Sequence, residues 1–510
     1  MLSSTTIWIA FALYMCFLLG VAFYVTQKEK KQQAGESLLK TSVAWPILVM
    51  TYIASLMSTW VFFAGPGAYY RGGLGYWISE MSYIALFPII AHFTMNKVWL
   101  INQEKGGDFV TPADFYYERF KSPILRTILA LIFLAASFPY ISSVLVAIAN
   151  AADYATGGAI NYQMAVIVVG LIMTIFVCIG GVKSAATADT VQGLLFIGLL
   201  WFIVIACLIV GFGGSLTAAI DTLWTNSPAF FSYPGPDGWV TNASRFGYPF
   251  ACAIGWTIML PHVFVRAGYF GDNLKSQRKL SYMTPMLQGI VWTGTMLIGL
   301  IGLALVSDLA KSDTELIIPY MIHNFVTAFN PTLAVMMMVG FFVGALAVGL
   351  STANAFLSVA SGIVASDLIK NTFHVNIPKE KENMVNRIII AVLGLGALVI
   401  ALNPPELIFT LIMFSIAMVM PLFPVLVFGL YWKKATKQAA IVSTIVGTVL
   451  VLMTYLVWHL GDTWYGALGL FGSAVTMVVV SLFTKQDEAD SKEFYETYER
   501  ANERFYEVQE

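Results

Sequence analysis

Two adjacent hydroxyl side chains, Ser351 and Thr352, stand inside one of the longest apolar runs of the chain. Together with Val348 they occupy positions i, i+3 and i+4, which share one face of an α-helix. A carbonyl and two hydroxyl oxygens on that face could ligate a hard cation if a neighbouring helix supplied two or three more. The hydroxyls could instead bond back to carbonyls one turn earlier or join two helices. We interpret the pair as half of a sodium site.

A second stretch with the same spacing could supply the missing oxygens. Ala54, Met57 and Ser58 repeat the i, i+3, i+4 pattern in an apolar run that continues into the Gly- and Pro-containing stretch at 64–67. If the helix unwinds there, the carbonyls of Ala54 and Met57 become free ligands. With the Val348 carbonyl and the two hydroxyls they make five uncharged oxygens. Such a set suits Na⁺ better than a divalent ion.

Ionisable residues inside apolar runs are the next candidates. Asp189 lies near the start of the run at 188–212. An ionisable group inside a span marks an ion pathway by default, but a carboxylate near a helix N-terminus can also be stabilised by the helix dipole. Both interpretations stay open for Asp189. Glu80 and Glu406 lie nearer the outer ends of their runs and are interpreted as solvated or anchoring groups, and His262 as structural.

The composition indicates that the chain folds in a lipid membrane and not in water. Of 510 residues 58% are hydrophobic and 11% are charged, and the mean hydropathy is +0.75. A soluble domain carries about 25% charged residues, so the sequence predicts an all-α polytopic membrane protein. The net charge of -1 gives no indication of a nucleic-acid partner. The four cysteines lie within apolar runs without disulfide or metal-ligand spacing and are interpreted as small core residues.

Thirteen apolar runs reach the length of about 20 residues that a membrane-spanning helix needs. The ninth is too long for one straight span, and we expect a break near Asn330. Of the 28 Lys and Arg residues, 25 fall on one set of alternating loops and 3 on the other. The rich side should be cytoplasmic, which puts the N-terminus outside and the C-terminus inside. The runs lie at 6–26, 45–69, 76–100, 124–151, 162–181, 188–212, 247–268, 281–307, 328–368, 386–402, 405–431, 438–459 and 463–484.

The second and seventh runs are interrupted by proline and glycine. Irregular backbone at membrane depth is tolerated only where it lines a cavity or packs on protein. The two runs are five apart, as expected for two inverted five-helix units with broken first helices, although a pair of kinked structural helices is the alternative. The expected organisation is a leading helix and loop at 1–44, repeats at 45–212 and 247–431, an extracellular loop at 213–246, two trailing helices at 432–484 and a cytoplasmic tail at 485–510.

Three separated motifs resemble the sodium:solute symporter family. They are Gly180-Gly181 followed by Asp189-Thr190-Val191-Gln192, the pair Ser351-Thr352 followed by Ser366-Asp367-Leu368-Ile369-Lys370, and Pro112-Ala113-Asp114-Phe115-Tyr116 with Arg119-Phe120. The resemblance covers about residues 5 to 485. It implies the leucine-transporter-like five-plus-five inverted repeat with one leading and two trailing spans. It also implies a sodium role for Ala54, Met57, Val348, Ser351 and Thr352, and an inner sodium exit or second sodium site at Asp189.

The substrate is less well specified by the sequence. Several segments look like the pantothenate permease and monocarboxylate branch, and Leu56 departs from the proline-permease pattern, which has an aspartate there. A midplane site for an organic acid needs aromatic surface and hydroxyl groups, although each such residue could also serve packing. The substrate-lining candidates are Ser55, Ser58, Trp60, Tyr140, Ser143, Trp256 and Thr257.

Charge balance adds a further expectation. Arg71 and Arg266 are placed at the ends of spans, so a carboxylate substrate would be balanced by half-helix N-termini and by co-transported sodium. Asp189 could face Ser351 and Thr352 and complete a second sodium site, which would make uptake electrogenic.

The expected protein is therefore a sodium-coupled symporter in the cell membrane and not an enzyme. Na⁺ is its coupling ion, and no other cofactor is expected. Its expected partners are a small solute, Na⁺ and the lipid bilayer, with no nucleic acid and no obligate protein partner. A symporter for an amino acid or another small polar solute, a transporter-like sensor and a channel are the alternatives. A channel would need a continuous polar pore, whereas the polar residues here concentrate at one depth.

Overall fold

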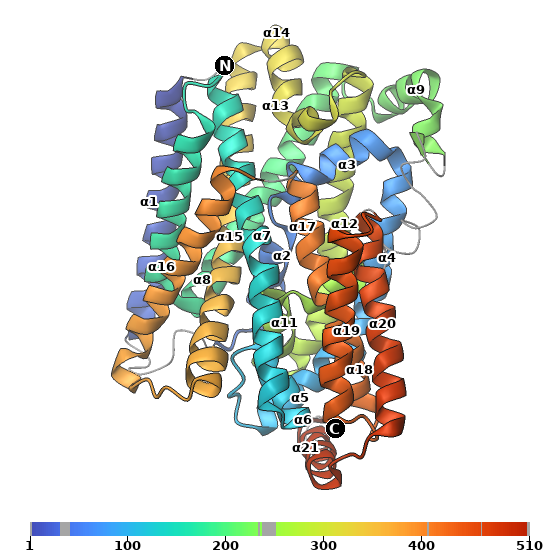
Figure 1. Cartoon of the computed structure of the whole chain (residues 1–510). Helices are drawn as coiled ribbons and strands as arrows, with labels where there is room; N and C mark the ends of the chain where they lie inside the picture. The colour runs from blue at the N-terminus through green and yellow to red at the C-terminus, as the bar shows by residue number, and fades with distance from the viewer. Residues whose placement is uncertain are drawn as a thin grey trace.

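The computed structural model describes residues 3–30, 41–232, 235–236, 251–404, 407–460 and 462–506, and the elements in them are helical (Figure 1). Part of the loop expected at 213–246, together with Glu406, lies outside these residues. The first half contains α1 Ser4–Lys30, α2 Trp45–Met57, η1 Thr59–Val61, α3 Ala64–Gly72, η2 Gly73–Tyr76, α4 Trp77–Phe93, α5 Met95–Glu104, α6 Pro112–Phe120, α7 Pro123–Thr156, α8 Tyr162–Phe212, α9 Leu216–Asn226 and η3 Pro228–Phe231. The second half contains η5 Ala251–Met259, α11 Pro261–Tyr269, α12 Leu274–Leu305, η6 Lys311–Leu316, α13 Ile317–Met321, η7 Ile322–Val326, α14 Thr327–Phe329, α15 Pro331–Gly362, η8 Ile363–Thr372, α16 Lys379–Leu402, α17 Ile408–Val419, α18 Leu422–Tyr431, α19 Lys437–Leu456, α20 Asp462–Phe483 and α21 Glu488–Tyr506.

The number of membrane-spanning helices is close to the expected thirteen. By length and apolar composition, ten helices of the described residues can cross a membrane, or eleven when the bent segment from Trp45 to Tyr76 counts as one span. The two expected spans that fall short are the shorter apolar stretch Tyr162–Cys178 and the segment at 251–269. The second is interrupted in its middle, which is why no continuous helix of sufficient length forms there.

The long helix α8 accounts for two of the expected spans. Its 51 residues would extend about 76 Å at 1.5 Å per residue, more than twice the hydrocarbon thickness of about 30 Å. Its first half runs antiparallel to α16, because Tyr162 bonds to Ala401 and Cys178 to Arg387. Its second half runs parallel to α12, since Leu200 packs at Gly294 and Gly211 at Leu305. Helices α12 and α16 run in the same direction, because only one membrane crossing, α15, lies between them. The two halves of α8 therefore cross the membrane in opposite directions, and the chain reverses between Cys178 and Ala185.

The first broken span is interrupted at Ser58. Helix α2 ends at Met57, Ser58 takes a positive φ of 49°, and the chain bends by 64° before α3. The sequence suggested two places for the interruption, the stretch at 54–58 and the Gly- and Pro-containing stretch at 64–67. The helix breaks at the first of them and not at Pro66. Pro66 lies in the first turn of α3, where its missing N–H leaves no helical hydrogen bond unmade.

The second broken span is interrupted at Leu260. The π-helix η5 ends at Met259, Leu260 is extended with ψ 135°, and α11 begins at Pro261. Proline at the first helical position is pre-set for helix entry, so here the proline does mark the break. The break expected within the ninth run is also present at Asn330, whose side chain accepts a hydrogen bond from the Leu333 N–H at 3.0 Å.

The paired breaks lie among the central helices, and the two trailing helices pack against each other at one side of the molecule (Figure 1). Helices α9 and α21 lie at opposite ends (Figure 1). The tail helix α21 packs on α5 and α6, where Glu493 pairs with Lys105 at 3.2 Å and Phe505 meets the ring of Trp99. Lys105 and other cations lower the pKa of Glu493. The tail is therefore a docked helix of 19 residues.

Helix α12 approaches the backbone of α3 closely at Gly299. A Cβ at Gly299 would lie 2.6 Å from the Pro66 carbonyl oxygen and 2.6 Å from the Tyr69 Cβ, whereas nothing lies within 4 Å of a Cβ at Gly289. We expect Gly299→Ala to destabilise the protein by about 1–3 kcal/mol through overpacking. The control Gly289→Ala should be neutral or slightly stabilising, because alanine is the better helix former. Thermal unfolding in detergent measures both, and equal midpoints would contradict this close approach.

Candidate functional site

The two hydroxyls singled out in α15 meet the end of broken helix α2. Ser351 Oγ lies 2.8 Å from the Ala54 carbonyl oxygen, and Thr352 Oγ1 lies 3.2 Å from that of Ser55. Both hydroxyls also lie within 3.0 Å of the Val348 carbonyl oxygen. Each hydroxyl has one proton and so donates to one of its two carbonyls at a time. Both interpretations of the pair, bonding back along its own helix and reaching a neighbouring helix, therefore describe real contacts.

Four of the five oxygens expected for a sodium site converge here. The carbonyls of Ala54 and Val348 and the hydroxyls of Ser351 and Thr352 form one buried cluster. Met57, the fifth expected ligand, is the last residue of α2 and stands at the break itself. The cluster carries no charged group. A small cation between these oxygens would take the place of the hydroxyl protons as the partner of the carbonyls.

The second broken span binds carbonyls in the same last turn of α2. The Trp256 Nε1–H donates to the Leu56 carbonyl at 3.1 Å, and His262 Nε2 lies 3.2 Å from the Ser55 carbonyl oxygen. The Tyr52 hydroxyl in turn donates to the Thr257 carbonyl. With Nε2 donating, Nδ1 of His262 is the unprotonated ring nitrogen. The two interruptions thus satisfy each other's backbone groups, and His262 is one of the links between them.

The seven substrate candidates divide into two groups. Trp60, Ser58, Tyr140 and Trp256 surround the break: the Trp60 and Trp256 rings lie 5.1 Å apart, and the Tyr140 hydroxyl donates to Ser58 Oγ at 3.2 Å. The other three hydroxyls bond back to carbonyls of their own helices, which is a common arrangement for such residues. These are Ser55 to Tyr52, Ser143 to Tyr140 and Thr257 to Ala253.

Two of the three aromatic side chains beside Trp60 were not predicted from the sequence. The rings of Phe409 and Tyr76 lie 5.2 Å and 6.3 Å from it, and they come from α17 and η2. Glu80, interpreted as solvated or anchoring, is instead fully buried and accepts a hydrogen bond from the Tyr69 hydroxyl. That interpretation of Glu80 was wrong because α3 and η2 fold back over the first turn of α4. An acidic residue inside an apolar run was the one available signal.

Asp189 forms a buried ion pair. Its Oδ2 accepts from Arg266 Nη2 at 3.2 Å and from Thr51 Oγ1 at 2.6 Å, and Arg266 Nε lies 3.1 Å from the same hydroxyl. Thr51 lies one helical turn before Ala54. Arg266 lies in the last turn of α11, as expected for the end of a span, but its side chain is buried, at 2% exposed. Arg266 therefore supplies the charge that balances Asp189, and the hydroxyls of Ser351 and Thr352 bond elsewhere.

Two of the three sequence motifs are joined by another buried charge cluster. Arg126 on α7 contacts Asp367 Oδ1 at 2.6 Å and also pairs with Asp114 on α6. Asp114 closes a capping box with Thr111 at the start of α6. Residues 112–120 and 366–370 are thus held together by one guanidinium. The motifs that looked separate in sequence form one contact between α6, α7 and η8.

Near the end of the molecule that carries α9, the broken helix α3 is fastened to α17. Arg71 in the last turn of α3 donates to Thr314 in η6. The next residue, Glu315, accepts from the N–H groups of Ile408 and Phe409 at the start of α17, at 3.3 Å and 3.0 Å. Burial raises the pKa of Glu315. The segment η6 therefore connects α3 to α17 over the aromatic rings around Trp60.

The fold and the two facing interruptions define the class: an all-helical membrane protein with the leucine-transporter-like five-plus-five inverted repeat. A substrate-bound, outward-open structure of a Na⁺-coupled sialic acid symporter superposes with a TM-score of 0.77 at 18% identity, over 94% of this chain and 98% of that one. The family model of the sodium:solute symporter family matches residues 38–447. The chain belongs to the sodium:solute symporter family.

Two relatives illustrate the range of substrates among similar proteins. The sodium/pantothenate symporter of Escherichia coli (strain K12) is 28% identical over 472 residues, 88% of this chain and 90% of that protein. The osmoregulated proline transporter OpuE of Bacillus subtilis (strain 168) is 26% identical over 466 residues, 88% of this chain and 89% of that protein. The relatives therefore include named carriers of different solutes.

The ion pair between Asp189 and Arg266 gives a stability prediction. Asp189→Asn or Arg266→Met alone should destabilise the protein by about 3–5 kcal/mol, because each leaves an unpaired buried charge. The double variant should recover much of that loss. Breaking the exposed pair of Lys492 and Glu496, 3.7 Å apart, with Lys492→Met should cost less than about 1 kcal/mol. Thermal unfolding of the purified variants tests this, and additive losses in the double variant would refute the pairing.

Proposed function

We propose that this protein is a secondary active transporter that couples sodium entry to the uptake of a small organic carboxylate, with pantothenate as the first candidate. The observation that carries the proposal is the convergence of the Ser351 and Thr352 hydroxyls on carbonyls at the broken end of α2. Free carbonyls beside hydroxyls, at membrane depth and without a charged group, are suitable ligands for Na⁺. Membership of the sodium:solute symporter family supports sodium as the coupling ion.

The sodium ligands in this proposal are the carbonyls of Ala54, Met57 and Val348 and the hydroxyls of Ser351 and Thr352. The ion is held between α2 and α15, beside the break at the end of α2. Solute binds on the other side of the same break, among Trp60, Trp256 and the linked hydroxyls of Tyr140 and Ser58. Sodium and solute thus stabilise one arrangement of the same interrupted segment, which is the physical basis of their coupling. No other cofactor is required for this mechanism.

Pantothenate is proposed because the sodium/pantothenate symporter relative aligns over most of both chains. A symporter for proline is the second candidate, because a proline transporter aligns almost as well. Leu56 favours the first candidate. Its carbonyl is bound by Trp256 and its side chain is apolar and buried, where the proline-permease pattern has an aspartate.

One co-transported sodium ion balances the single charge of a monocarboxylate, so a second ion would need a carboxylate of the protein. The buried Arg266 is already paired with Asp189, so it adds no net positive charge for a carboxylate substrate. The N-terminus of α11 and the co-transported sodium must supply that balance. Asp189 Oδ1 has no hydrogen-bond partner among the described residues, so this carboxylate is our candidate for a second sodium site or the inner exit.

Uptake into proteoliposomes tests the substrate class and the stoichiometry together. With an inward Na⁺ gradient, labelled pantothenate or a simple monocarboxylate should accumulate at least tenfold faster than proline. An inside-negative potential should stimulate this uptake, because one net positive charge gains about 2.3 kcal/mol per 100 mV. Proline uptake without carboxylate uptake would reassign the substrate. Carboxylate uptake that ignores the potential would contradict the two-sodium stoichiometry.

The sodium site gives a second prediction. Ser351→Ala and Thr352→Ala should each raise the Na⁺ concentration for half-maximal uptake at least tenfold, about 1.4 kcal/mol per lost ligand. The matched control is Thr444→Ala on the trailing helix α19, where a buried hydroxyl bonds back to the Ala440 carbonyl at 2.8 Å. That control should leave the sodium dependence unchanged. Unaltered sodium dependence in both site variants would place the ion elsewhere.

We also propose that the protein lies in the cell membrane with its N-terminus outside and its C-terminus in the cytoplasm, as the loop charges indicate. In a variant without the four native cysteines, Lys275→Cys should react with an impermeant thiol reagent only after permeabilisation. Ser312→Cys, in the exposed start of η6, should react on intact cells. Lys275 is chosen because its neighbour Ser276 is buried and accepts from the Trp45 N–H. The opposite labelling pattern would invert the topology.

A further inference from the structure

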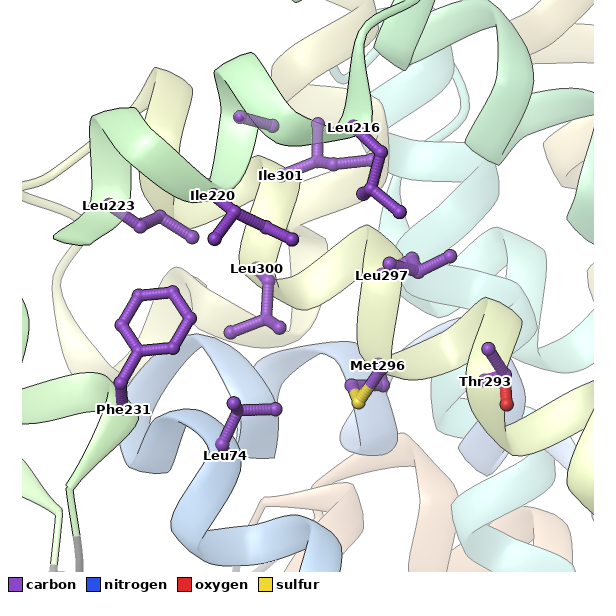
Figure 2. Close-up of a pocket in the computed structure, with 11 residues that line it drawn as sticks. Leu74, Leu216, Ile220, Leu223, Phe231, Thr293, Met296, Leu297, Leu300 and Ile301 are labelled. Carbon is purple, nitrogen blue, oxygen red and sulfur yellow. The ribbon is translucent and has the colours of Figure 1, made fainter.

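An apolar cavity of about 270 Å³ lies between α9 and α12, outside the site described above. Helix α9 forms its roof and α12 one wall, while Leu74 of η2 and Phe231 of η3 close it from below and from the side (Figure 2). Ten of its eleven lining residues are apolar. They are Leu74, Leu216, Ala219, Ile220, Leu223, Phe231, Met296, Leu297, Leu300 and Ile301, with Thr293 as the eleventh.

Water is a poor occupant for this cavity. A buried water needs two to four polar partners, and apolar cavities of this kind stay dry while accepting apolar ligands. An unfilled cavity also forfeits dispersion contacts along its whole lining. The lining therefore favours an apolar ligand that can be supplied from the surroundings of the protein.

The cavity continues the lipid-facing surface of α12. Along that helix Tyr282, Met286 and Ile290 are 49%, 63% and 45% exposed. Thr293 and Leu297 follow at the next i+3 and i+4 positions, on the same face, and they line the cavity. Helix α12 is a membrane-spanning helix, so its exposed apolar face contacts acyl chains. The cavity is the end of that lipid-facing stripe, where α9 covers it.

Helix α9 has the pattern of a helix that lies in the membrane interface. Leu216, Ala219, Ile220 and Leu223 share its cavity-facing side, at positions i, i+3, i+4 and i+7. Trp224 is 61% exposed beside them. Tryptophan is enriched at the level of lipid headgroups, and amphipathic helices bury their apolar face at the boundary between headgroups and acyl chains. A lipid with its headgroup beside α9 would direct its tail along α12 into the cavity.

We propose that this cavity is a binding site for one acyl chain of a membrane phospholipid. The chain enters along the exposed face of α12 and ends between α9, Leu74 and Phe231. The site is separate from the substrate site, but one of its walls belongs to the broken helix. Leu74 lies in η2, two residues after the end of α3, and Gly73, at φ +59°, leaves no room for a side chain against the Phe230 backbone. A bound chain therefore contacts the segment that joins α3 to α4.

Photo-crosslinking tests the occupant. The full-length protein is placed in nanodiscs of phosphatidylethanolamine and phosphatidylglycerol that contain a small fraction of phospholipid with a diazirine near the end of one acyl chain. After irradiation, the labelled peptides are mapped by mass spectrometry. We expect label on α9 or on residues 293–301 at least fivefold above label on the lipid-facing stripe of α16, which includes Val392 and Val399 at 62% and 66% exposed.

Matched variants on one helix distinguish the cavity from ordinary contact with lipid. Ala219→Trp fills the cavity and should reduce the label in it to the level seen on α16. Ala218→Trp changes the neighbouring position, which does not line the cavity, and should leave the label unchanged. Leu300→Trp fills the cavity from the opposite wall and serves if Ala219→Trp fails to fold.

Three outcomes would overturn the proposal. Label at the cavity no higher than on α16 would make this surface ordinary bilayer contact. Label that persists in both filling variants would place the acyl chain elsewhere. Protection of α9 from the probe in a stable dimer would assign the cavity to a second copy of the chain.

Discussion

The structure depends on satisfying the backbone at one interruption deep in the membrane. Ending α2 at Met57 leaves carbonyls without helical partners where lipid cannot hydrate them, and each such group would cost several kcal/mol. Ser351 reaches the Ala54 carbonyl from α15, and Trp256 reaches the Leu56 carbonyl from η5. The bent span exists because helices distant in sequence supply its hydrogen bonds. A ligand that replaces any of these partners necessarily affects the others.

This dependence connects the site to both ends of the molecule. One turn from the interruption, Thr51 shares its hydroxyl with Asp189 and Arg266, so α2, α8 and α11 are fixed to one another. Further away, Arg126 joins two of the sequence motifs at one end, and Glu315 caps α17 near the other. In the proposed mechanism, sodium and solute both bind at the point where these connections meet. Binding there can therefore be transmitted through rigid helices without a separate relay.

The sequence predicted the class of fold and the residues around the break because both follow from local patterns. Apolar length revealed most spans, and the hydroxyl pair at i+3 and i+4 from Val348 revealed the contact with α2. The stretch at 54–58 was one possible place for the break, but the sequence could not decide between it and Pro66, because a positive φ at a serine has no local signature. The partner of Asp189 and the burial of Glu80 also escaped prediction, since both depend on which helices become neighbours after folding.

The central claim is that Na⁺ binds between α2 and α15 and replaces the hydroxyl protons as the partner of the Ala54 and Val348 carbonyls. Equilibrium binding of radioactive sodium to the purified protein, in the absence of any solute, tests it most directly. The account predicts saturable binding to the unmodified protein, with at least one ion per chain fewer in the double variant Ser351→Ala/Thr352→Ala under the same conditions. Binding of the same number of ions with the same affinity in both proteins would contradict it.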